Sequence, residues 1–448
     1  MRPSFSTAIV PALVALASVQ ACAHGTEDPG SFAPTSSDDS GVDSGAPSAV
    51  DAAGGDARFA CGGVGQPCCG GNLCHGALVC TPTGVCVAMP GGDDGGAADG
   101  PASGDDGPSL PEAGGGCSGQ GMLSCGGSCV DGASDPKNCG ACGHDCLTTA
   151  CNAGVCDSIA ISSQFVPPGR LTIDATGAYF TNGDGTVRSV PLAGGTTATL
   201  AQGLSQPMGI AVDAQYAYAA SQDGRIVRAP IAGTPTLDVL ATAQPTPYAL
   251  AVDATNVYWT NRASGAGNGS LMACAKGGCA SAPTTLVSGL HVQEPKGLVV
   301  AGASLYWTSL NFGGELNQVP TTGGPMTTVG SGLGYPYEIA ISGTTAVMVL
   351  YGQGGAIATL PTSGGTATNL VGGQSFPTEG TTDGTSAYWT LTVPAAQTGA
   401  TLMKCTLSGG SATTQVLATG SQPAGSVAVD ATWVYWLSND GTVRKTAK

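Results

Sequence analysis

Two glutamates at equivalent positions of neighbouring segments are the best candidates for chemistry in this chain. Glu338 and Glu379 each follow a proline by two residues, in the sequences Pro-Tyr-Glu and Pro-Thr-Glu. Paired carboxylates can hold a metal ion, or they can divide the roles of general acid and general base. A triad or a multi-histidine centre is not indicated, because only His291 of the chain's 4 histidines lies beyond residue 157. The glutamate pair therefore carries the strongest hint of catalysis.

The two glutamates belong to an internal repeat, and the repeat predicts the scaffold that positions them. A motif of the form P-x-x-[IL]-A-V-D-A-T-x-V-Y-W-T returns seven times between Pro168 and the C-terminus. Its acidic or small residue falls at Asp174, Asp213, Asp253, Ala301, Ser342, Asp383 and Asp430. Strand-rich repeats of roughly 40 residues, separated by turns, are typical of a β-propeller in which each repeat forms one four-stranded blade. Residues 157–448 are thus expected to form this domain.

The pattern inside each repeat predicts how the blades pack and how the ring closes. An aromatic pair such as Tyr258-Trp259 lies in the second strand, where neighbouring side chains point to opposite faces. Both faces of a blade are covered by its neighbours, so we interpret these aromatics as packing between blades. The seventh repeat stops after its third strand, and residues 158–163 can supply the fourth. Such closure removes an exposed sheet edge and gives seven blades.

The loops that precede the innermost strands, together with the hairpins between second and third strands, emerge on one face of such a ring. These loops carry varied residues, which we take as candidate ligand-binding residues: Arg170, Met208, Tyr248, Lys296, Tyr337, Glu338 and Glu379. The hairpins at 261–270 and 391–401 are longer than their counterparts. Long loops on one face of a rigid scaffold are a common place for recognition, although drift in an unselected loop also explains their length.

The N-terminal region predicts export. Residues 1–22 resemble a signal peptide, and Val-Gln-Ala-Cys resembles a lipobox that would make Cys22 the lipidated first residue. Ala-Cys-Ala at the same place also fits ordinary signal-peptide cleavage and secretion. Residues 23–60 and 87–116 are rich in Gly, Ala, Ser, Asp and Pro and are expected to be disordered linkers. The favoured location is the outer membrane or cell surface.

The 18 cysteines indicate disulfides, as expected for an exported chain. Six lie within 61–86 and eight within 117–156, and both segments are too short to fold around an apolar core. The sequence leaves the pairings inside these two modules open. In the propeller, Cys274 and Cys279 are spaced to form a bridge across a turn, which leaves Cys405 as a buried free thiol.

Two parts of the chain resemble known families. The segment 117–156, with its core C-G-G-x-C-V-D-x-x-x-D-P-x-N-C-G-A-C-G-x-x-C, resembles the stigma-specific cysteine-rich proteins of plants and similar repeats in large secreted myxobacterium-like proteins. That resemblance implies a compact extracellular spacer. The propeller repeats resemble the YWTD and NHL-type families, although Asn182, Asn261 or Ser309 replaces the Asp of YWTD.

We expect an all-β protein, with a seven-bladed propeller preceded by two small disulfide-rich modules and disordered linkers. Its expected function is non-catalytic binding of a protein or glycan at the cell surface, without a metal or cofactor. The alternatives are a metal-dependent hydrolase of the propeller lactonase type, built on Glu338 and Glu379, and a subunit of an envelope assembly complex. Membrane contact is expected through the lipid anchor only. Nucleic acid is disfavoured, because no basic stripe is present to neutralise phosphates.

Overall fold

The computed structural model describes residues 78–80, 86–88 and 117–448, apart from 263–268, 281, 290–293, 311–312, 393–399, 408–413 and 421–422. Every regular element of the described part is a β-strand. Within these residues no helix has the length and apolar character needed to cross a membrane. The predicted signal peptide, Cys22 and nearly all of both predicted linkers lie outside the described residues.

The chain divides into two compact units, residues 1–108 and 109–448. In the first unit the described elements are β1 (Leu78–Cys80) and β2 (Cys86–Ala88), which pair as an antiparallel hairpin. They fall at the end of the predicted six-cysteine module, and the pairing of its cysteines lies outside the described residues.

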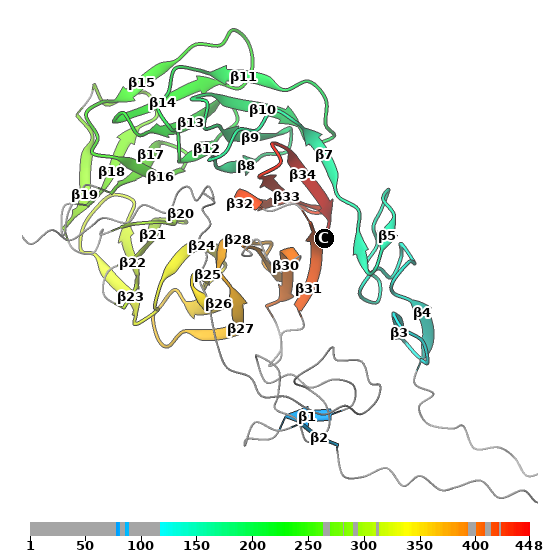
Figure 1. Cartoon of the computed structure of the whole chain (residues 1–448). Helices are drawn as coiled ribbons and strands as arrows, with labels where there is room; N and C mark the ends of the chain where they lie inside the picture. Colours follow the sequence, from blue (N-terminus) through cyan, green and yellow to red (C-terminus); the bar gives the residue numbers. More distant parts are fainter. Residues whose placement is uncertain are drawn as a thin grey trace, which may run out of the picture. The chain divides into compact units, whose positions relative to one another are not determined.

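The second unit contains a ring of seven antiparallel four-stranded sheets (Figure 1). From the inner to the outer strand, blade one is β8 (Leu171–Ile173), β9 (Gly177–Thr181), β10 (Val187–Pro191) and β11 (Ala198–Ala201). Blade two is β12 (Ile210–Val212), β13 (Tyr216–Ser221), β14 (Arg225–Pro230) and β15 (Asp238–Ala241). Blade three is β16 (Pro247–Val252), β17 (Asn256–Asn261), β18 (Ser270–Ala275) and β19 (Thr284–Ser288). Blade four is β20 (Leu298–Ala301), β21 (Ser304–Ser309), β22 (Glu315–Pro320) and β23 (Thr327–Ser331).

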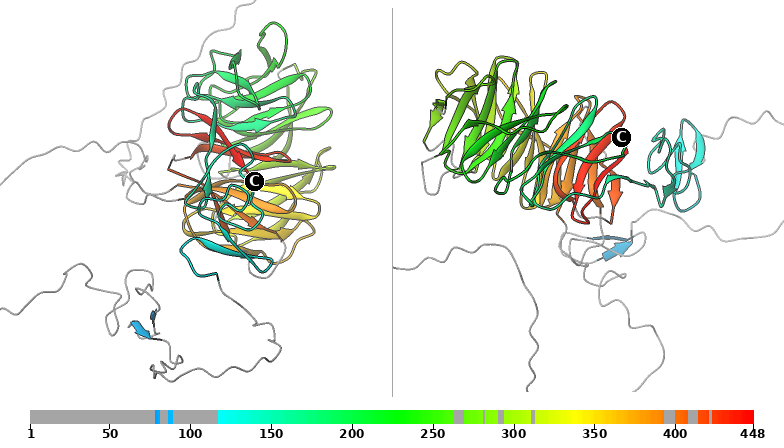
Figure 2. Two further views of the ribbon diagram at one scale, coloured as in Figure 1. Left: turned by 90° about the vertical axis from the view of Figure 1, so that its right-hand side faces the viewer. Right: turned by 90° about the horizontal axis from the view of Figure 1, so that it is seen from above.

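The remaining blades follow the same order and complete the ring. Blade five is β24 (Pro336–Ser342), β25 (Thr345–Leu350), β26 (Gln353–Pro361) and β27 (Thr368–Ser375). Blade six is β28 (Pro377–Thr382), β29 (Ser386–Leu391), β30 (Ala400–Thr406) and β31 (Thr414–Thr419). Blade seven is β32 (Pro423–Val429), β33 (Trp433–Ser438), β34 (Val443–Ala447) and β7 (Ile159–Ser162). The side views show these blades standing next to one another around the ring (Figure 2).

The ring closes as the sequence predicts, with an N-terminal strand on the outside of the last blade. β7 pairs antiparallel with β34, in the register Val443 to Ser162 and Lys445 to Ile159. The Arg444 side chain adds a hydrogen bond from Nε to the Ser158 hydroxyl at 3.0 Å. Seven blades and this mode of closure are both confirmed.

The aromatic pairs of the second strands form the cores between the blades. One apolar cluster, for example, joins Tyr218 and Ile226 of blade two to Val257, Trp259 and Met272 of blade three. Four of the repeat tryptophans are fully buried: Trp259, Trp307, Trp389 and Trp436. The aromatic ladder therefore stabilises the contact between neighbouring blades, as predicted.

The repeat aspartate has a structural role that we did not predict. In five blades it accepts a hydrogen bond from the tyrosine hydroxyl five residues later: Asp174 from Tyr179, Asp213 from Tyr218, Asp253 from Tyr258, Asp383 from Tyr388, and Asp430 from Tyr435. Its other carboxylate oxygen caps the turn between the first two strands, as where the backbone N–H groups of Thr255 and Asn256 bond to Asp253. Burial opposes ionisation, but these hydrogen bonds hold the pKa of Asp253 below its ordinary value. The carboxylate therefore stabilises the fold above about pH 4, and this contribution is lost as the pH falls towards its folded pKa.

Replacing Tyr258 with phenylalanine should lower the free energy of unfolding by about 1–2 kcal/mol, because the half-buried Asp253 carboxylate loses a hydrogen-bond donor. The matched control is Tyr306→Phe in blade four, where Ala301 stands at the aspartate position and that acceptor is absent. We expect the control to change stability by less than about 0.5 kcal/mol. Urea unfolding of both variants measures the difference, and equal losses would show that the aspartate contact contributes nothing.

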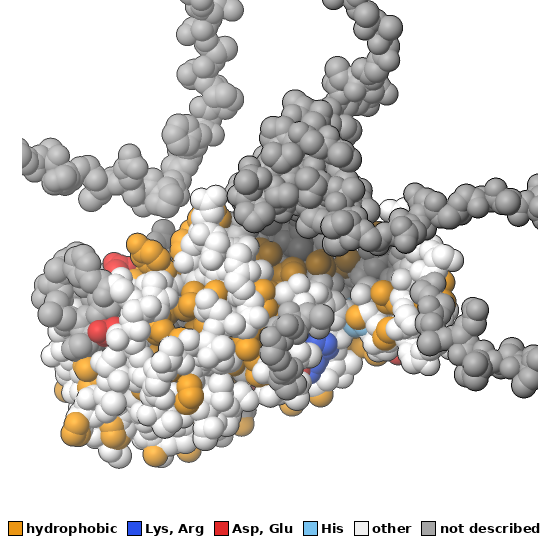
Figure 3. Space-filling view, turned by 90° about the horizontal axis from the view of Figure 1, so that it is seen from below, with side chains coloured by type: hydrophobic (Ala, Val, Ile, Leu, Met, Phe, Trp, Pro, Cys, Tyr) orange, Lys and Arg blue, Asp and Glu red, His pale blue; other side chains and the backbone are white. Residues whose placement is uncertain are grey.

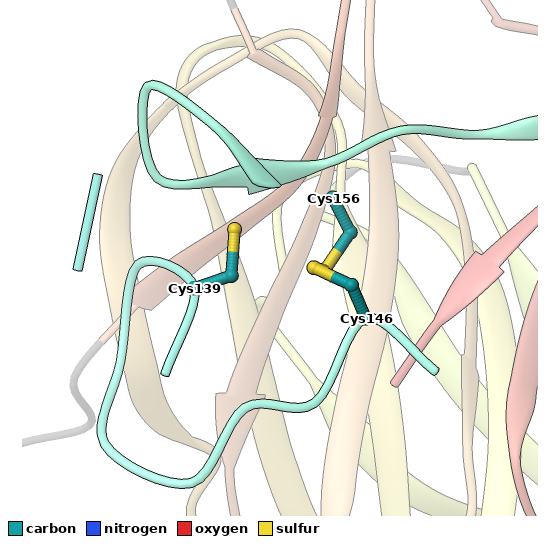
Figure 4. A group of neighbouring side chains, drawn as sticks. All are labelled: Cys139, Cys146 and Cys156. Atoms are coloured by element: carbon teal, nitrogen blue, oxygen red, sulfur yellow. A yellow bond between two sulfur atoms is a disulfide. The ribbon is translucent and has the colours of Figure 1, made fainter. Parts of the chain in front are cut away.

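The eight-cysteine segment is a small module with two hairpins, β3 (Met122–Cys125) with β4 (Ser128–Asp131) and β5 (Cys151–Asn152) with β6 (Val155–Cys156). Four disulfides hold it together: Cys117–Cys129, Cys125–Cys142, Cys139–Cys151 and Cys146–Cys156. The sulfur atoms of Cys139, Cys146 and Cys156 lie close together, and Figure 4 shows the bond between the last two. Each of the three sulfurs belongs to a disulfide, so these cysteines stabilise the module and do not act as thiolate ligands of a metal ion.

The propeller cysteines also follow the prediction. Cys274 and Cys279 form a disulfide with their Cα atoms 5.4 Å apart. Cys405 is a free cysteine within β30 and is buried. Burial raises the pKa of its thiol, so it remains protonated at neutral pH.

Candidate functional site

The innermost strands of all seven blades surround a cavity of about 350 Å³ on the axis of the ring. The side chains at its mouth come from the start of these strands, where several blades carry a glycine. At Gly297 an added Cβ would lie 2.8 Å from Cγ2 of Ile339 in the next blade. Glycine therefore permits the close approach of neighbouring inner strands, and the long side chains beside it point into a narrow space.

Arg170 crosses this cavity from blade one to blades five and six. Its Nη1 atom donates to Oε2 of Glu338 at 2.7 Å and to Oε2 of Glu379 at 2.6 Å. Its Nη2 atom donates to the Tyr248 hydroxyl at 3.2 Å. The charged side chains are only 14%, 15% and 10% exposed for Arg170, Glu338 and Glu379. We call these three residues the buried triad.

The buried triad strongly changes the ionisation of its members. Burial raises the pKa of Glu338 to about 7, with Arg170 opposing this shift and Glu379 adding to it. Burial disfavours the charged form of Arg170, but Glu379, Tyr248 and Glu338 together outweigh it and raise the arginine pKa well above its ordinary value. Arg170 therefore stays protonated, while Glu338 titrates close to neutral pH.

A second group of cations surrounds the ring of Tyr248 at the mouth of the cavity. Lys296 Nζ lies 5.3 Å from the centre of the Tyr248 ring and 5.2 Å from that of Tyr337. The Arg262 guanidinium lies 4.5 Å from the Tyr248 ring centre. Arg262 forms an ion pair with Glu294, whose Oε2 is also 3.9 Å from Lys296 Nζ. Burial lowers the pKa of Lys296 and raises that of Tyr337.

The charges of this site contrast with the rest of the visible surface. On the side of the propeller drawn in Figure 3, the described side chains are mostly apolar or uncharged, with few basic or acidic groups. Only 10% of the residues in the chain are charged. Six charged side chains at one site are therefore an unusual concentration for this protein.

Six of the seven candidate residues from the sequence come together here: Arg170, Tyr248, Lys296, Tyr337, Glu338 and Glu379. The seventh, Met208, is half-buried beside Gly209, and Gly209 rather than Met208 lines the cavity. The central parts of the two long hairpins, and His291, lie outside the described residues. Arg262 lies in the hairpin at 261–270, which the sequence singled out without naming this residue, and Glu294 was not predicted.

The two glutamates do meet, as their equivalent positions suggest, but a protein cation lies between them. One guanidinium nitrogen of Arg170 bridges the two carboxylates, as a bound metal ion would have to do. One oxygen of Glu338 and one of Glu379 thus both accept a hydrogen bond from Arg170. The arrangement fits a charge-compensated pair better than a metal-binding pair.

Comparisons with known proteins identify the fold. No protein-family model and no curated protein matches the chain. Virginiamycin B lyase from Staphylococcus aureus is similar in structure, with 13% identity, a TM-score of 0.52, and coverage of 65% of this chain and 98% of that chain. A catalytically inactive variant of that lyase with quinupristin gives 14% identity and a TM-score of 0.52 over the same shares.

A chain from a mitotic checkpoint complex is also similar, at 12% identity and a TM-score of 0.53, covering 65% of this chain and 93% of that chain. Proteins with unrelated functions share this architecture. Identities this low establish a β-propeller and do not assign an activity.

Proposed function

We propose that this protein is a non-catalytic binding protein whose ligand site is the mouth of the propeller channel. We call this site the channel mouth and define it by Tyr248, Arg262, Lys296 and Tyr337. The observation that carries the proposal is that Arg170 forms ion pairs with both glutamates. The two carboxylates hold Arg170 in place, and Arg170 in turn positions Tyr248. The cations and aromatic rings of the channel mouth are then available to contact a ligand.

The composition of the channel mouth supports recognition. Tyrosine and arginine dominate binding sites because they combine a large contact area with hydrogen-bonding groups. Here they lie at the rim of a cavity in a rigid ring, which is where ligand sites commonly form. The ligand is a protein or a glycan outside the cell. We also propose export and lipid attachment through Cys22, on the basis of the N-terminal sequence.

A hydrolase remains the second candidate, favoured by one observation. Glu338 is buried in a cavity and has a pKa raised to about 7, which suits a general acid or base at neutral pH. Virginiamycin B lyase has this fold and acts as an enzyme, so a propeller of this kind can carry an active site. If Glu338→Gln removes a measurable turnover while ligand affinity stays unchanged, the enzyme is the correct assignment.

Truncating the channel mouth should weaken ligand binding at least tenfold, equivalent to about 1.4 kcal/mol. The full chain is immobilised, and the binding of fractionated protein and glycan material from the cell envelope is measured. The variants Lys296→Gln and Tyr337→Ala are compared with wild type. Lys137→Gln, an exposed lysine in the disulfide module, is the matched control. Retention of the same material by wild type and both site variants would refute the channel mouth as the binding site.

A further inference from the structure

Aromatic side chains continue outwards from the channel mouth across blades five and six. Tyr351 follows β25, and Phe376 precedes β28, so both lie at the ends of strands that open onto the face of the channel mouth. The ring centres of Tyr337 and Tyr351 are 5.6 Å apart, and those of Tyr351 and Phe376 are also 5.6 Å apart. We call the series of Tyr248, Tyr337, Tyr351 and Phe376 the aromatic row.

The outer part of the aromatic row is open to solvent. Tyr351 is 38% exposed, and the adjacent Tyr335, whose carbonyl accepts a hydrogen bond from the Tyr351 N–H, is 61% exposed. Among the described residues, Tyr335 and Tyr351 are the only aromatic side chains that are substantially exposed to solvent. Single exposed apolar side chains are ordinary, but neighbouring aromatics beside a cavity mark an interaction site.

At the inner end of the row, two cations share one carboxylate. Arg262 and Lys296 share the single carboxylate of Glu294, while Glu338 and Glu379 are engaged by Arg170. Within the described part of the chain, the buried Arg262 Nε has no hydrogen-bond acceptor. Burying a donor without an acceptor is unfavourable, so an added anionic group would satisfy both charge and hydrogen bonding.

We infer that the channel mouth and aromatic row bind an acidic oligosaccharide, with sugar rings along Tyr337, Tyr351 and Phe376 and a carboxylate at Lys296 and Arg262. This inference rests on the proposed function and names its ligand class. The C–H faces of sugar rings pack against aromatic faces, and tyrosine hydroxyls and cations match sugar hydroxyls and carboxylates. A purely apolar ligand would leave Arg262 Nε without an acceptor.

The test is calorimetric titration of the full chain with defined probes. The acidic probes are tetrasaccharides of α-1,4-linked galacturonic acid and of β-1,4-linked mannuronic acid, and the neutral matches are their methyl esters. Tetraglutamate represents an acidic peptide. We expect at least one acidic tetrasaccharide to bind at least tenfold more tightly than its ester. Absence of binding by both acidic tetrasaccharides would overturn the inference.

Variants separate the two parts of the site. The double variant Tyr351→Ala/Phe376→Ala should weaken the acid and its ester equally, by tenfold or more. Lys296→Gln should remove the preference for the acid and leave ester binding in place. Tyr216→Ala, near a turn of the opposite face, and Lys137→Gln are the controls, and thermal melting verifies that each variant is folded.

The outcomes also separate this inference from the proposed function. If tetraglutamate binds, loses affinity in Lys296→Gln, and neither tetrasaccharide binds, the saccharide assignment is wrong while the channel mouth remains a binding site. If a tetrasaccharide binds but no channel-mouth variant alters its affinity, both the inference and the proposed site are wrong.

Discussion

Replacing Arg170 with methionine is expected to lower the free energy of unfolding by about 3–5 kcal/mol at pH 8, because two buried carboxylates lose their shared cation. The cost should shrink at lower pH. The folded pKa of Glu338 is about 7, above its ordinary value of 4.5, so its ionisation penalises the fold as the pH rises from 4.5 through 7. At pH values well below this folded pKa the carboxyl group in the folded protein is neutral and needs no partner. Urea unfolding at pH 5 and pH 8 measures both effects.

The reciprocal change tests the same network. Adding Glu338→Gln and Glu379→Gln to Arg170→Met should restore most of the lost stability at pH 8, because the buried charges are removed together. Arg188→Met is the control, since its ion pair with Asp184 is partly exposed and worth at most about 1 kcal/mol. If Arg170→Met costs no more than the control at pH 8, the buried triad does not stabilise the fold.

Removing the closing strand should have the other large effect. A chain that begins at Pro167 lacks β7 and leaves β34 with an unpaired edge. It also loses the buried side chains of Ile161 and Phe165, each worth about 2–5 kcal/mol. That sum approaches the whole stability of an ordinary domain, about 5–15 kcal/mol, so we expect an aggregated or unfolded product.

The matched control is a chain that begins at Asp157, which lacks the disulfide module but retains β7. We expect the control to be monomeric and to melt cooperatively. Light scattering and circular dichroism compare the two chains. A monomeric chain without β7 that melts at the control's temperature would contradict closure as a requirement for the folded ring.

Most of the architecture could be predicted because it repeats. The period of the Asp-x-x-x-x-Tyr-Trp motif gives the blade count, and the truncated seventh repeat points to residues 158–163 as its missing strand. The bridge between Cys274 and Cys279 follows from spacing across one turn. Disulfide pairing in the module at 117–156 was not predictable, because eight cysteines in 40 residues permit many pairings of similar loop length.

The site was predictable only in part, because its contacts join distant blades. Repeat position places Arg170, Glu338 and Glu379 on one face, yet their meeting depends on the diameter of the channel and on the reach of an arginine side chain. The hydrogen bond between Tyr258 and Asp253 is local and could have been found from the five-residue spacing. Tyr351 follows its strand at a position where no other repeat has an aromatic residue. Phe376 shares its position before the inner-strand proline with only one other aromatic, Tyr335, so no pattern marked the pair.

Metal titration of wild type and Glu338→Gln tests most directly whether the channel is a binding site built on a charge-compensated pair. With Arg170 bound to both glutamates, elemental analysis and calorimetry with Ca²⁺ and Zn²⁺ should give less than one ion per chain, and Glu338→Gln should not change that value. One tightly bound ion per chain, lost in Glu338→Gln, would contradict this account and favour a metal-dependent enzyme.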